Sequence, residues 1–157
     1  MRHVLTIILI AMVPTSSTQN ANDRDAVLKV VQIFFDSMTA RDADGARKIL
    51  VPEGRFYAMD MRKPKSDPQS FSNEEYFTRL EKSKYTSRER IWNPEVRVHG
   101  LIATVWAAYD LWVDGKYSHC GVDAFDLIKT DEGWKIAGGA FTMEAKCEPS
   151  PLGPLKQ

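Results

Sequence analysis

The chain has 157 residues, and its 21 Lys and Arg side chains balance 21 Asp and Glu, so the formal net charge is zero at pH 7. This balance, with no basic cluster, argues against nucleic acid or an anionic membrane surface as a partner. The length suits a single domain with one core, and the sequence contains no internal repeat or low-complexity tract.

Residues 1–21 have the three regions of a secretory signal peptide. A weakly positive start precedes an apolar run over residues 4–13, which is too short to span a bilayer. Small polar residues then resemble a cleavage region, and we expect cleavage between Thr18 and Ala21. The segment predicts a secreted or periplasmic protein with no membrane attachment after processing. A buried N-terminal strand is the alternative interpretation.

Apolar spacing and capping residues predict two helices at the start of the mature chain. Residues 23–41 carry an apolar stripe at three- and four-residue spacing, made of Val27, Val30, Val31, Phe34 and Met38. Asp42 is typical of the cap of a second, shorter helix that continues to Leu50. Residues 55–60 alternate between apolar and polar, which predicts a short strand.

A third helix is predicted from the capping box that begins at Ser72. The Ser72 side chain can accept from the backbone of Glu75, and the Glu75 side chain can accept from the backbone of Ser72. Residues 63–70, before this helix, are predicted to form a polar loop. Residues 87–94, after it, are predicted to link the helix to a sheet.

Three long antiparallel strands are predicted over residues 95–113, 116–129 and 134–144. Asp114-Gly115 is a two-residue hairpin turn, because its glycine supplies the positive φ that such turns need. Counting back from that turn places Asp110 opposite His119 and Trp106 opposite Asp123.

Alternation then predicts what each face of the sheet carries. One face mixes aromatic, acidic and histidine side chains, namely Trp106, Asp110, Trp112, His119, Asp123 and Phe125. The other is mostly apolar, with Tyr109, Val122 and Phe141, and would suit a homodimer formed through the sheet. A slip of one residue would exchange the two faces, and Gly138-Gly139 could form a bulge.

Helices followed by an antiparallel meander define an α+β fold. With the run from His119 to Phe125 and the following Gly133 to Ile136, this order resembles the nuclear transport factor two-like superfamily over about residues 23–147. The SnoaL-like, ketosteroid isomerase-like and lumazine-binding types are the similar members. The resemblance implies a cone, in which a curved antiparallel sheet wraps around three N-terminal helices and encloses a pocket. We expect the domain over residues 22–147 and an extended or disordered tail over 148–157.

The resemblance places Asp123 where ketosteroid isomerases carry the aspartic acid that donates a hydrogen bond to an oxyanion. An acid in an apolar site has a raised pKa, so it can stay protonated and donate. Phe34 stands about where the oxyanion-hole tyrosine of those enzymes would be, and Ala58 near their general base. Steroid isomerisation is therefore not expected. An aspartate bonded to backbone or to a structural arginine is the alternative for Asp123.

His119 and Asp110 are the second catalytic candidates, because a carboxylate beside a histidine suits general acid–base work. His119 and Asp123 are four residues apart on a strand, about 13 Å, so a substrate would have to span them. A structural ion pair is the alternative. A metal site shared with Glu144 is a weaker interpretation, and we expect neither a metal nor another cofactor.

A pocket of this kind would take a small apolar or aromatic molecule, and five aromatic side chains are candidates to bind it: Phe34, Tyr57, Trp106, Trp112 and Phe125. The same residues could be ordinary core. The sequence thus favours a secreted small-molecule-binding domain that could act as a lyase, isomerase or hydrolase. A non-catalytic ligand-binding or dimerisation module is the alternative.

Cys120 and Cys147 are the only cysteines, and in an oxidising compartment such a pair predicts a disulfide. Simple pairing puts Cys147 near Tyr117, about 10 Å along the strand from Cys120. A bulge at Gly138-Gly139, or a turn after Glu144, would close this gap. The alternative is a nucleophilic Cys120 beside His119.

Overall fold

The computed structural model describes residues 16–65 and 67–155. The elements in chain order are α1 (Ser16–Ala40), α2 (Ala43–Ile49), β1 (Leu50–Asp60), β2 (Gln69–Ser72), α3 (Asn73–Lys82), β3 (Ser87–His99), β4 (Ile102–Val113), β5 (Lys116–Thr130) and β6 (Gly133–Met143). The strands form one sheet in the order β2-β1-β6-β5-β4-β3. β1 is parallel to β6, and the other neighbours are antiparallel.

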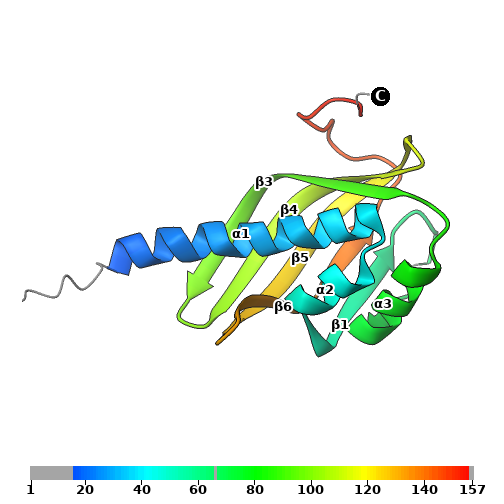
Figure 1. Cartoon of the computed structure of the whole chain (residues 1–157). Coiled ribbons are helices and arrows are strands. Elements are labelled where there is room, and N and C mark those ends of the chain that lie inside the picture. Colours follow the sequence, from blue (N-terminus) through cyan, green and yellow to red (C-terminus); the bar gives the residue numbers. More distant parts are fainter. Residues whose placement is uncertain (1–15, 66, 156–157) are drawn as a thin grey trace, which may run out of the picture.

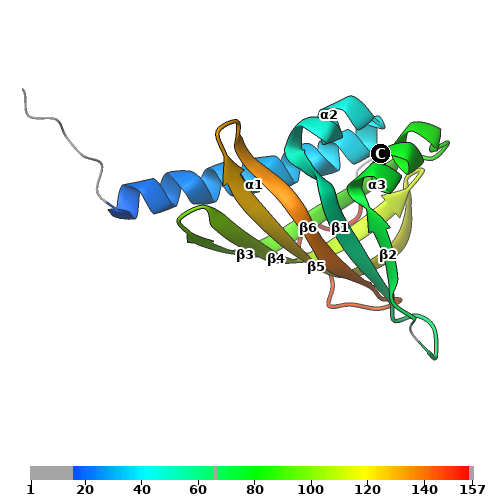
Figure 2. The same ribbon diagram turned by 90° about the horizontal axis from the view of Figure 1, so that it is seen from below.

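The sheet is bent, and the helices lie on one side of it (Figures 1 and 2). α1 crosses this face, while α2 and α3 lie at one end of the sheet near β1. The predicted α+β cone with three N-terminal helices is therefore confirmed. Its core fills the space between α1 and the concave face, with Val27, Val31 and Phe35 of α1 packed in the same cluster as Val105, Phe125, Leu127 and Ile136 of the strands.

The predicted helix caps are present. The Asp42 side chain accepts from the backbone N–H of Gly45 at 2.8 Å, at the start of α2. The capping box of α3 has both of its bonds, between the Ser72 hydroxyl and the Glu75 backbone and between the Glu75 carboxylate and the Ser72 backbone. These local bonds satisfy backbone N–H groups that have no partner within the helix.

α1 begins at Ser16, before the predicted start at residue 23. The predicted cleavage region therefore falls within α1, and residues 1–15 of the predicted signal segment over residues 1–21 lie outside the described residues. Among the residues that are described, no helix is both long enough and apolar enough to cross a membrane.

The meander has four strands where three were expected. The predicted first strand is two strands, β3 and β4, which are joined at Gly100 with φ 57°. Residues 87–94, predicted to be a linker, are the first half of β3, and β2 follows the predicted polar loop. The sequence pattern does not predict the turn at Gly100, because residues 95–113 alternate as one continuous stretch.

A bulge at Ser118 changes which residues face each other across β4 and β5. The hairpin begins as predicted, with Val113 opposite Lys116. The register then shifts, so Leu111 pairs with His119, and Asp110 lies opposite Cys120. The predicted pairs Asp110–His119 and Trp106–Asp123 are therefore wrong, because one extra residue in β5 moves β4 by one position relative to it.

The bulge also exchanges the faces of β4. Tyr109 and Ala107 lie on the inner face of the sheet with Asp123. Tyr109 and Ala107 are each 1% exposed, so Tyr109 cannot contribute to a contact surface on the outer face. Trp106 instead points outward and is 56% exposed. The predicted composition of both faces was thus right for β5 and reversed for β4.

A second register shift, at Ala137 beside the predicted Gly138-Gly139, brings the cysteines together. It moves β6 so that Glu144 bridges Cys120. Cys120 and Cys147 form the predicted disulfide, with a Cα–Cα distance of 6.1 Å. Gly121 permits the close approach of β5 and β6 here, since a Cβ on it would lie 2.1 Å from the Thr142 carbonyl oxygen. Cys120 is therefore not available as a nucleophile.

Candidate functional site

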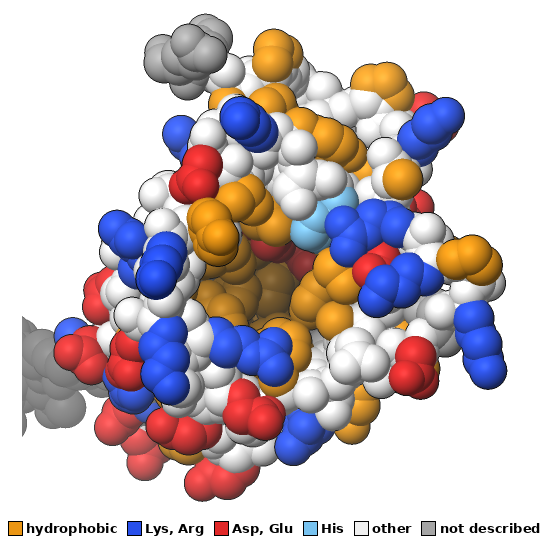
Figure 3. All heavy atoms as spheres, turned by 90° about the vertical axis from the view of Figure 1, so that its right-hand side faces the viewer, with side chains coloured by type: hydrophobic (Ala, Val, Ile, Leu, Met, Phe, Trp, Pro, Cys, Tyr) orange, Lys and Arg blue, Asp and Glu red, His pale blue; other side chains and the backbone are white. Residues whose placement is uncertain are grey.

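The interior of the cone contains an apolar cavity of about 90 Å³. Figure 3 shows it as a deep hollow with hydrophobic walls, acidic side chains at its far end and basic side chains around its mouth. It is lined by Phe34, Met38, Phe56, Phe71, Tyr76, Glu89, Asp123, Phe125, Ala140 and Phe141. The enclosed part has room for about three water molecules at roughly 30 Å³ each, so a ring compound would enter it with one edge and extend into the open mouth.

Aromatic rings from six elements form the wall, and Phe34 of α1 lies at their centre. Its ring centroid is 5.2 Å from that of Tyr76, 5.7 Å from that of Phe125 and 5.8 Å from that of Phe56. Rings at such distances pack favourably and leave a dry, rigid surface. Phe34 and Phe125, two of the predicted ligand-binding residues, therefore line the cavity.

Two carboxyl groups meet at the cavity wall, from Asp123 on β5 and Glu89 on β3. A hydrogen bond links them, which requires that one of the two is protonated. Burial raises the pKa of Asp123 to about 7, although the bond to Glu89 lowers it in part. Burial, followed by the charge of Asp123, raises the pKa of Glu89 well above its usual range. Two carboxyls this close hold one proton as a unit.

The Asp123 Oδ2 atom is buried, and no described group outside the acid pair forms a hydrogen bond with it. The hydroxyl of Tyr76 is also buried at the cavity and has no hydrogen-bond partner among the described residues. Burial raises the pKa of Tyr76, so its hydroxyl remains protonated and able to donate. An unpaired buried polar group costs about 1–3 kcal/mol, and a ligand that bonded to it would recover that energy.

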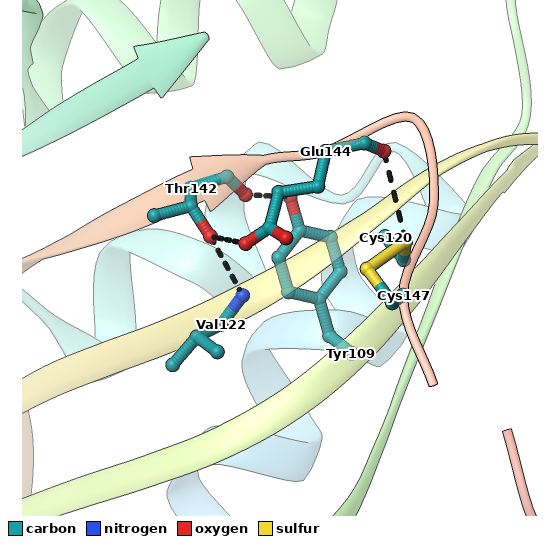
Figure 4. The surroundings of a disulfide bond; sticks show 6 residues. All are labelled: Tyr109, Cys120, Val122, Thr142, Glu144 and Cys147. Atoms are coloured by element: carbon teal, nitrogen blue, oxygen red, sulfur yellow. Dashed lines mark hydrogen bonds between the residues drawn. A yellow bond between two sulfur atoms is a disulfide. The ribbon is translucent and has the colours of Figure 1, made fainter. Parts of the chain in front are cut away.

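The hydroxyl of Tyr109, by contrast, already donates a hydrogen bond within the protein. It donates to the Thr142 carbonyl oxygen at 2.6 Å, as Figure 4 shows beside the disulfide. The Thr142 hydroxyl in turn donates to Glu144 at 2.9 Å and accepts from the backbone of Val122 at 3.0 Å. This network fixes the end of β6 against β5 rather than facing a ligand.

His119 lies on the same inner face of β5 as Asp123, but it is not beside Asp110. Its ring is 7% exposed and packs edge-on against Tyr109, with centroids 5.8 Å apart. Its Nδ1 atom is 2.9 Å from the Ser118 hydroxyl. Burial, and then the positive charge of Arg62, lowers the pKa of His119, so the ring is neutral at pH 7.

The charged neighbours of His119 are Arg62 and Asp60. Arg62 holds the Asp60 carboxylate with two bonds, at 2.7 and 3.0 Å, and these bonds lower the pKa of Asp60. The sequence indicated a carboxylate partner for His119, but it comes from β1 rather than from β4.

Asp110 lies on the outer face and binds Arg90 of β3, which donates to both of its carboxylate oxygens. The predicted His119–Asp110 pair is therefore wrong, because the Ser118 bulge turns Asp110 away from the cone. No three His, Cys, Asp or Glu side chains in the described ranges gather as a metal site would require.

Three of the predicted ligand-binding aromatics do not line the cavity. Tyr57 and Trp106 are 49% and 56% exposed. Trp112 packs against Tyr117, with centroids 5.7 Å apart, and under the guanidinium of Arg90. Trp106 and Trp112 were assigned to the inner face from a register that the bulge changes.

Glu89 is the site residue that the sequence interpretation missed, since it fell in the predicted linker. A signal was present, because residues 87–91 alternate and place Glu89 and Ile91 on one side and Arg88 and Arg90 on the other. Gly100-Leu101 is the two-residue turn that separates β3 from β4, and its glycine has the positive φ that such turns need.

A bent sheet around helices, with a pocket inside, defines a protein of the NTF2-like superfamily. The chain belongs to the family described as putative lumazine-binding, whose model matches residues 22–142. No curated protein matches the sequence.

Solved structures share this fold at low sequence identity. An NTF2-like protein from Cytophaga hutchinsonii is 13% identical, with a TM-score of 0.66 over 76% of this chain and 97% of that chain. An NTF2-like protein from Streptomyces avermitilis, titled a putative dehydratase, is 16% identical, with a TM-score of 0.61 over 78% and 96%. A protein of unknown function with a cystatin-like fold from Nostoc punctiforme is 11% identical, with a TM-score of 0.61 over 84% and 96%. Similarity at this level concerns the fold alone.

Proposed function

We propose that this protein binds a small, uncharged ring compound in its interior cavity and exchanges protons with it through Asp123 and Glu89. The observation that carries the proposal is the buried Asp123 carboxyl among aromatic rings, whose Oδ2 atom has no hydrogen-bond partner outside the acid pair. Its family's description makes lumazine, a flat ring with amide groups, the natural first probe. The aromatic walls would stack on such a ring while the acid pair bonds to its polar edge.

The acid pair supports a lyase, isomerase or hydrolase reaction, each of which needs a proton donor and a proton acceptor. A protonated Asp123 would donate to an oxygen on which negative charge develops, and the Tyr76 hydroxyl would supply a second donor. The carboxyl that lacks the proton would accept one from the ligand. A pKa near 7 for Asp123 suits both directions of transfer at neutral pH. His119, neutral at the inner face, would act only on a larger ligand.

Binding of lumazine, followed by its intrinsic fluorescence, tests this function. We expect saturable binding by the native chain, with Asp123→Asn weakening it by about 2- to 10-fold, because a hydrogen bond between neutral groups contributes about 0.5–1.5 kcal/mol. Asp126→Asn is the matched control, since Asp126 is exposed on the outer face of the same strand. Equal binding by all three chains would refute the assignment of Asp123.

We also propose that the protein works outside the cytoplasm. The apolar run over residues 4–13 supports export, and the disulfide between Cys120 and Cys147 supports an oxidising compartment. Mass spectrometry of the protein recovered from the periplasm or medium tests this. A mature N-terminus between residues 19 and 22 is expected, and a chain retained inside the cell with Met1 present would contradict it.

A homodimer formed through the outer face of the sheet, with or without catalysis, is a second candidate. The exposed Trp106 and Tyr57 support it, since they flank shallow depressions that share Ala124 on the outer face. Large exposed aromatics are unusual on a free surface and enriched at contacts. Sedimentation equilibrium tests this, and Trp106→Ala should shift a dimer toward monomer while Tyr85→Ala, at an exposed residue away from those depressions, should not.

A further inference from the structure

A second hollow, of about 220 Å³, lies between α1, β3 and the C-terminal tail. It is lined by Gln32, Phe35, Asp36, Thr39, Arg88, Glu89, Arg90, Ile91 and Leu152. Glu89 therefore borders both this side crevice and the interior cavity. Glu89 as a whole residue is only partly buried, whereas Asp123, with which it shares a hydrogen bond, is 5% exposed.

The position of β3 explains why Glu89 borders both the interior cavity and the side crevice. β3 is an edge strand, so within the described part of the chain no further strand lies beyond it to close the cone. α1 packs against β3, and the crevice lies where the two part around Glu89. Charged and polar side chains surround the crevice, and walls of this kind hold water.

The C-terminal tail crosses the outer end of this crevice through Leu152. Two attachments hold the tail there, the disulfide at Cys147 and a hydrogen bond of 2.8 Å from Arg90 to the Gly153 carbonyl oxygen. Arg90 follows Glu89 directly in β3, so the residue that anchors the tail adjoins the residue that borders the cavity. Leu152 is itself 49% exposed, so it narrows the crevice without sealing it.

We propose that Glu89 connects the interior site with solvent through this side crevice and carries protons between Asp123 and water there, with Leu152 limiting access. This inference rests on the proposed function, since it assigns separate roles to the two acids. Asp123 faces the ligand, and Glu89 restores its proton when the ligand blocks the mouth of the cavity.

The proton balance is simple. Asp123 gives the one proton of the pair to the ligand, hydronium or a buffer acid in the crevice then protonates Glu89, and Glu89 passes that proton to Asp123 along their shared hydrogen bond. A ligand that loses a proton drives the same steps backward.

The groups that face Glu89 come from several elements. Asp123 and Asp110 on the sheet disfavour its charged form. The hydroxyls of Tyr76 and Tyr109 lie within range of its charge. Asp36 of α1 and the flanking Arg88 and Arg90 line the crevice side. The charged groups around the crevice are thus of both signs, which suits water and protons better than an organic anion.

Thiol labelling tests the geometry. We would place a single new cysteine by Glu89→Cys or Asp123→Cys and measure its reaction with a small cationic methanethiosulfonate, with mass spectrometry confirming that the native disulfide is intact. We expect position 89 to react at least about 10-fold faster than position 123. Leu152→Gly should accelerate reaction at position 89 only, while the control Leu155→Gly, in the same tail but outside the crevice lining, should change neither.

The test separates this inference from the proposed function. Equal rates at the two positions, or no response of position 89 to Leu152→Gly, would overturn the side access even if lumazine binds. Failure of lumazine to bind would overturn the proposed function and leave the labelling pattern as it is.

A measurement on the native side chains covers the case in which the cysteine variants do not fold. Carbon-13 carboxyl resonances of Glu89 and Asp123 would be titrated in the native chain and in the Leu152→Gly and Leu155→Gly chains. A wider crevice hydrates Glu89, so its titration midpoint should fall in the Leu152→Gly chain by more than that of Asp123. Unchanged midpoints in that variant would contradict the role of Leu152.

Discussion

Arg90 and Asp110 join β3 to β4 across the outer face of the sheet. The guanidinium donates to both carboxylate oxygens, and the side chains are only 15% and 4% exposed. The two residues are also directly opposite each other in the pairing of β3 with β4. Backbone and side-chain interactions therefore join the two strands at the same place. Because Arg90 also bonds to Gly153, one side chain holds two strands and the tail together.

Replacement of Arg90 by Gln should destabilise the protein by about 3–5 kcal/mol, since it leaves the Asp110 charge buried without a partner. Chemical denaturation followed by circular dichroism measures the change. Arg24→Gln is the control, because the Arg24–Asp25 pair is exposed and should contribute less than about 1 kcal/mol. A loss below that value for Arg90→Gln would mean that water reaches and solvates Asp110.

The disulfide should contribute strongly to stability, because it closes a loop with a sequence separation of 27. Loop-closure entropy for this length corresponds to about 3–4 kcal/mol. The double variant Cys120→Ser and Cys147→Ser should lose about this much in urea denaturation and should no longer respond to a reducing agent. A native chain whose unfolding is unchanged by reduction would contradict the expectation.

Local chemistry made much of this architecture predictable from the sequence. The Asp42 cap, the Ser72–Glu75 capping box and the Asp114-Gly115 turn each depend on neighbouring residues alone, and each is present. The inward direction of Asp123 was also predictable, because β5 has a clear alternation that ends in the apolar Phe125 and Leu127.

The arrangement across strands was not predictable, because it depends on a single inserted residue. Nothing in Ser118 itself marks a bulge, and yet it decides whether Asp110 or Tyr109 shares the cone with Asp123. Glu89 was lost for a related reason, since an edge strand with alternating charges resembles a polar linker. The sequence therefore predicted Asp123 as a site residue, whereas Glu89 could be identified as its partner only from the arrangement of the sheet.

Removal of the α3 cap should have a modest and local effect. Ser72→Ala deletes the hydroxyl that accepts from the Glu75 backbone at 3.1 Å, and such losses cost about 0.5–2 kcal/mol. The lost cap is at the start of α3, the helix that carries Tyr76 and Phe77. Amide hydrogen exchange should therefore become faster in the first turn of α3 before it does so in the sheet. Ser70→Ala, at an exposed residue of the preceding strand, is the control. Uniform destabilisation in both variants would rule out a capping effect.

The buried acid pair should make stability fall as pH rises through the weakly acidic range. The pKa of Asp123 is about 7 in the folded protein and 3.8 as its ordinary value. Between these values the unfolded chain has lost a proton that the folded chain still holds, so each pH unit favours unfolding by about 1.4 kcal/mol per proton. This contribution to stability is full below pH 4 and is lost by about pH 7.

Asp123→Asn removes this titration, because an amide does not ionise. The difference in unfolding free energy between the variant and the native chain should therefore shift in favour of the variant from pH 4 to pH 7, and level off above that. Using the difference between two chains cancels the other groups that titrate in this range, including His119, whose lowered pKa makes the fold less stable as pH falls. Glu89 also titrates, so Glu89→Gln in both backgrounds completes a double-mutant cycle. A free-energy difference that stays flat with pH would mean that Asp123 is ionised in the folded protein, and its role as a proton donor would then be wrong.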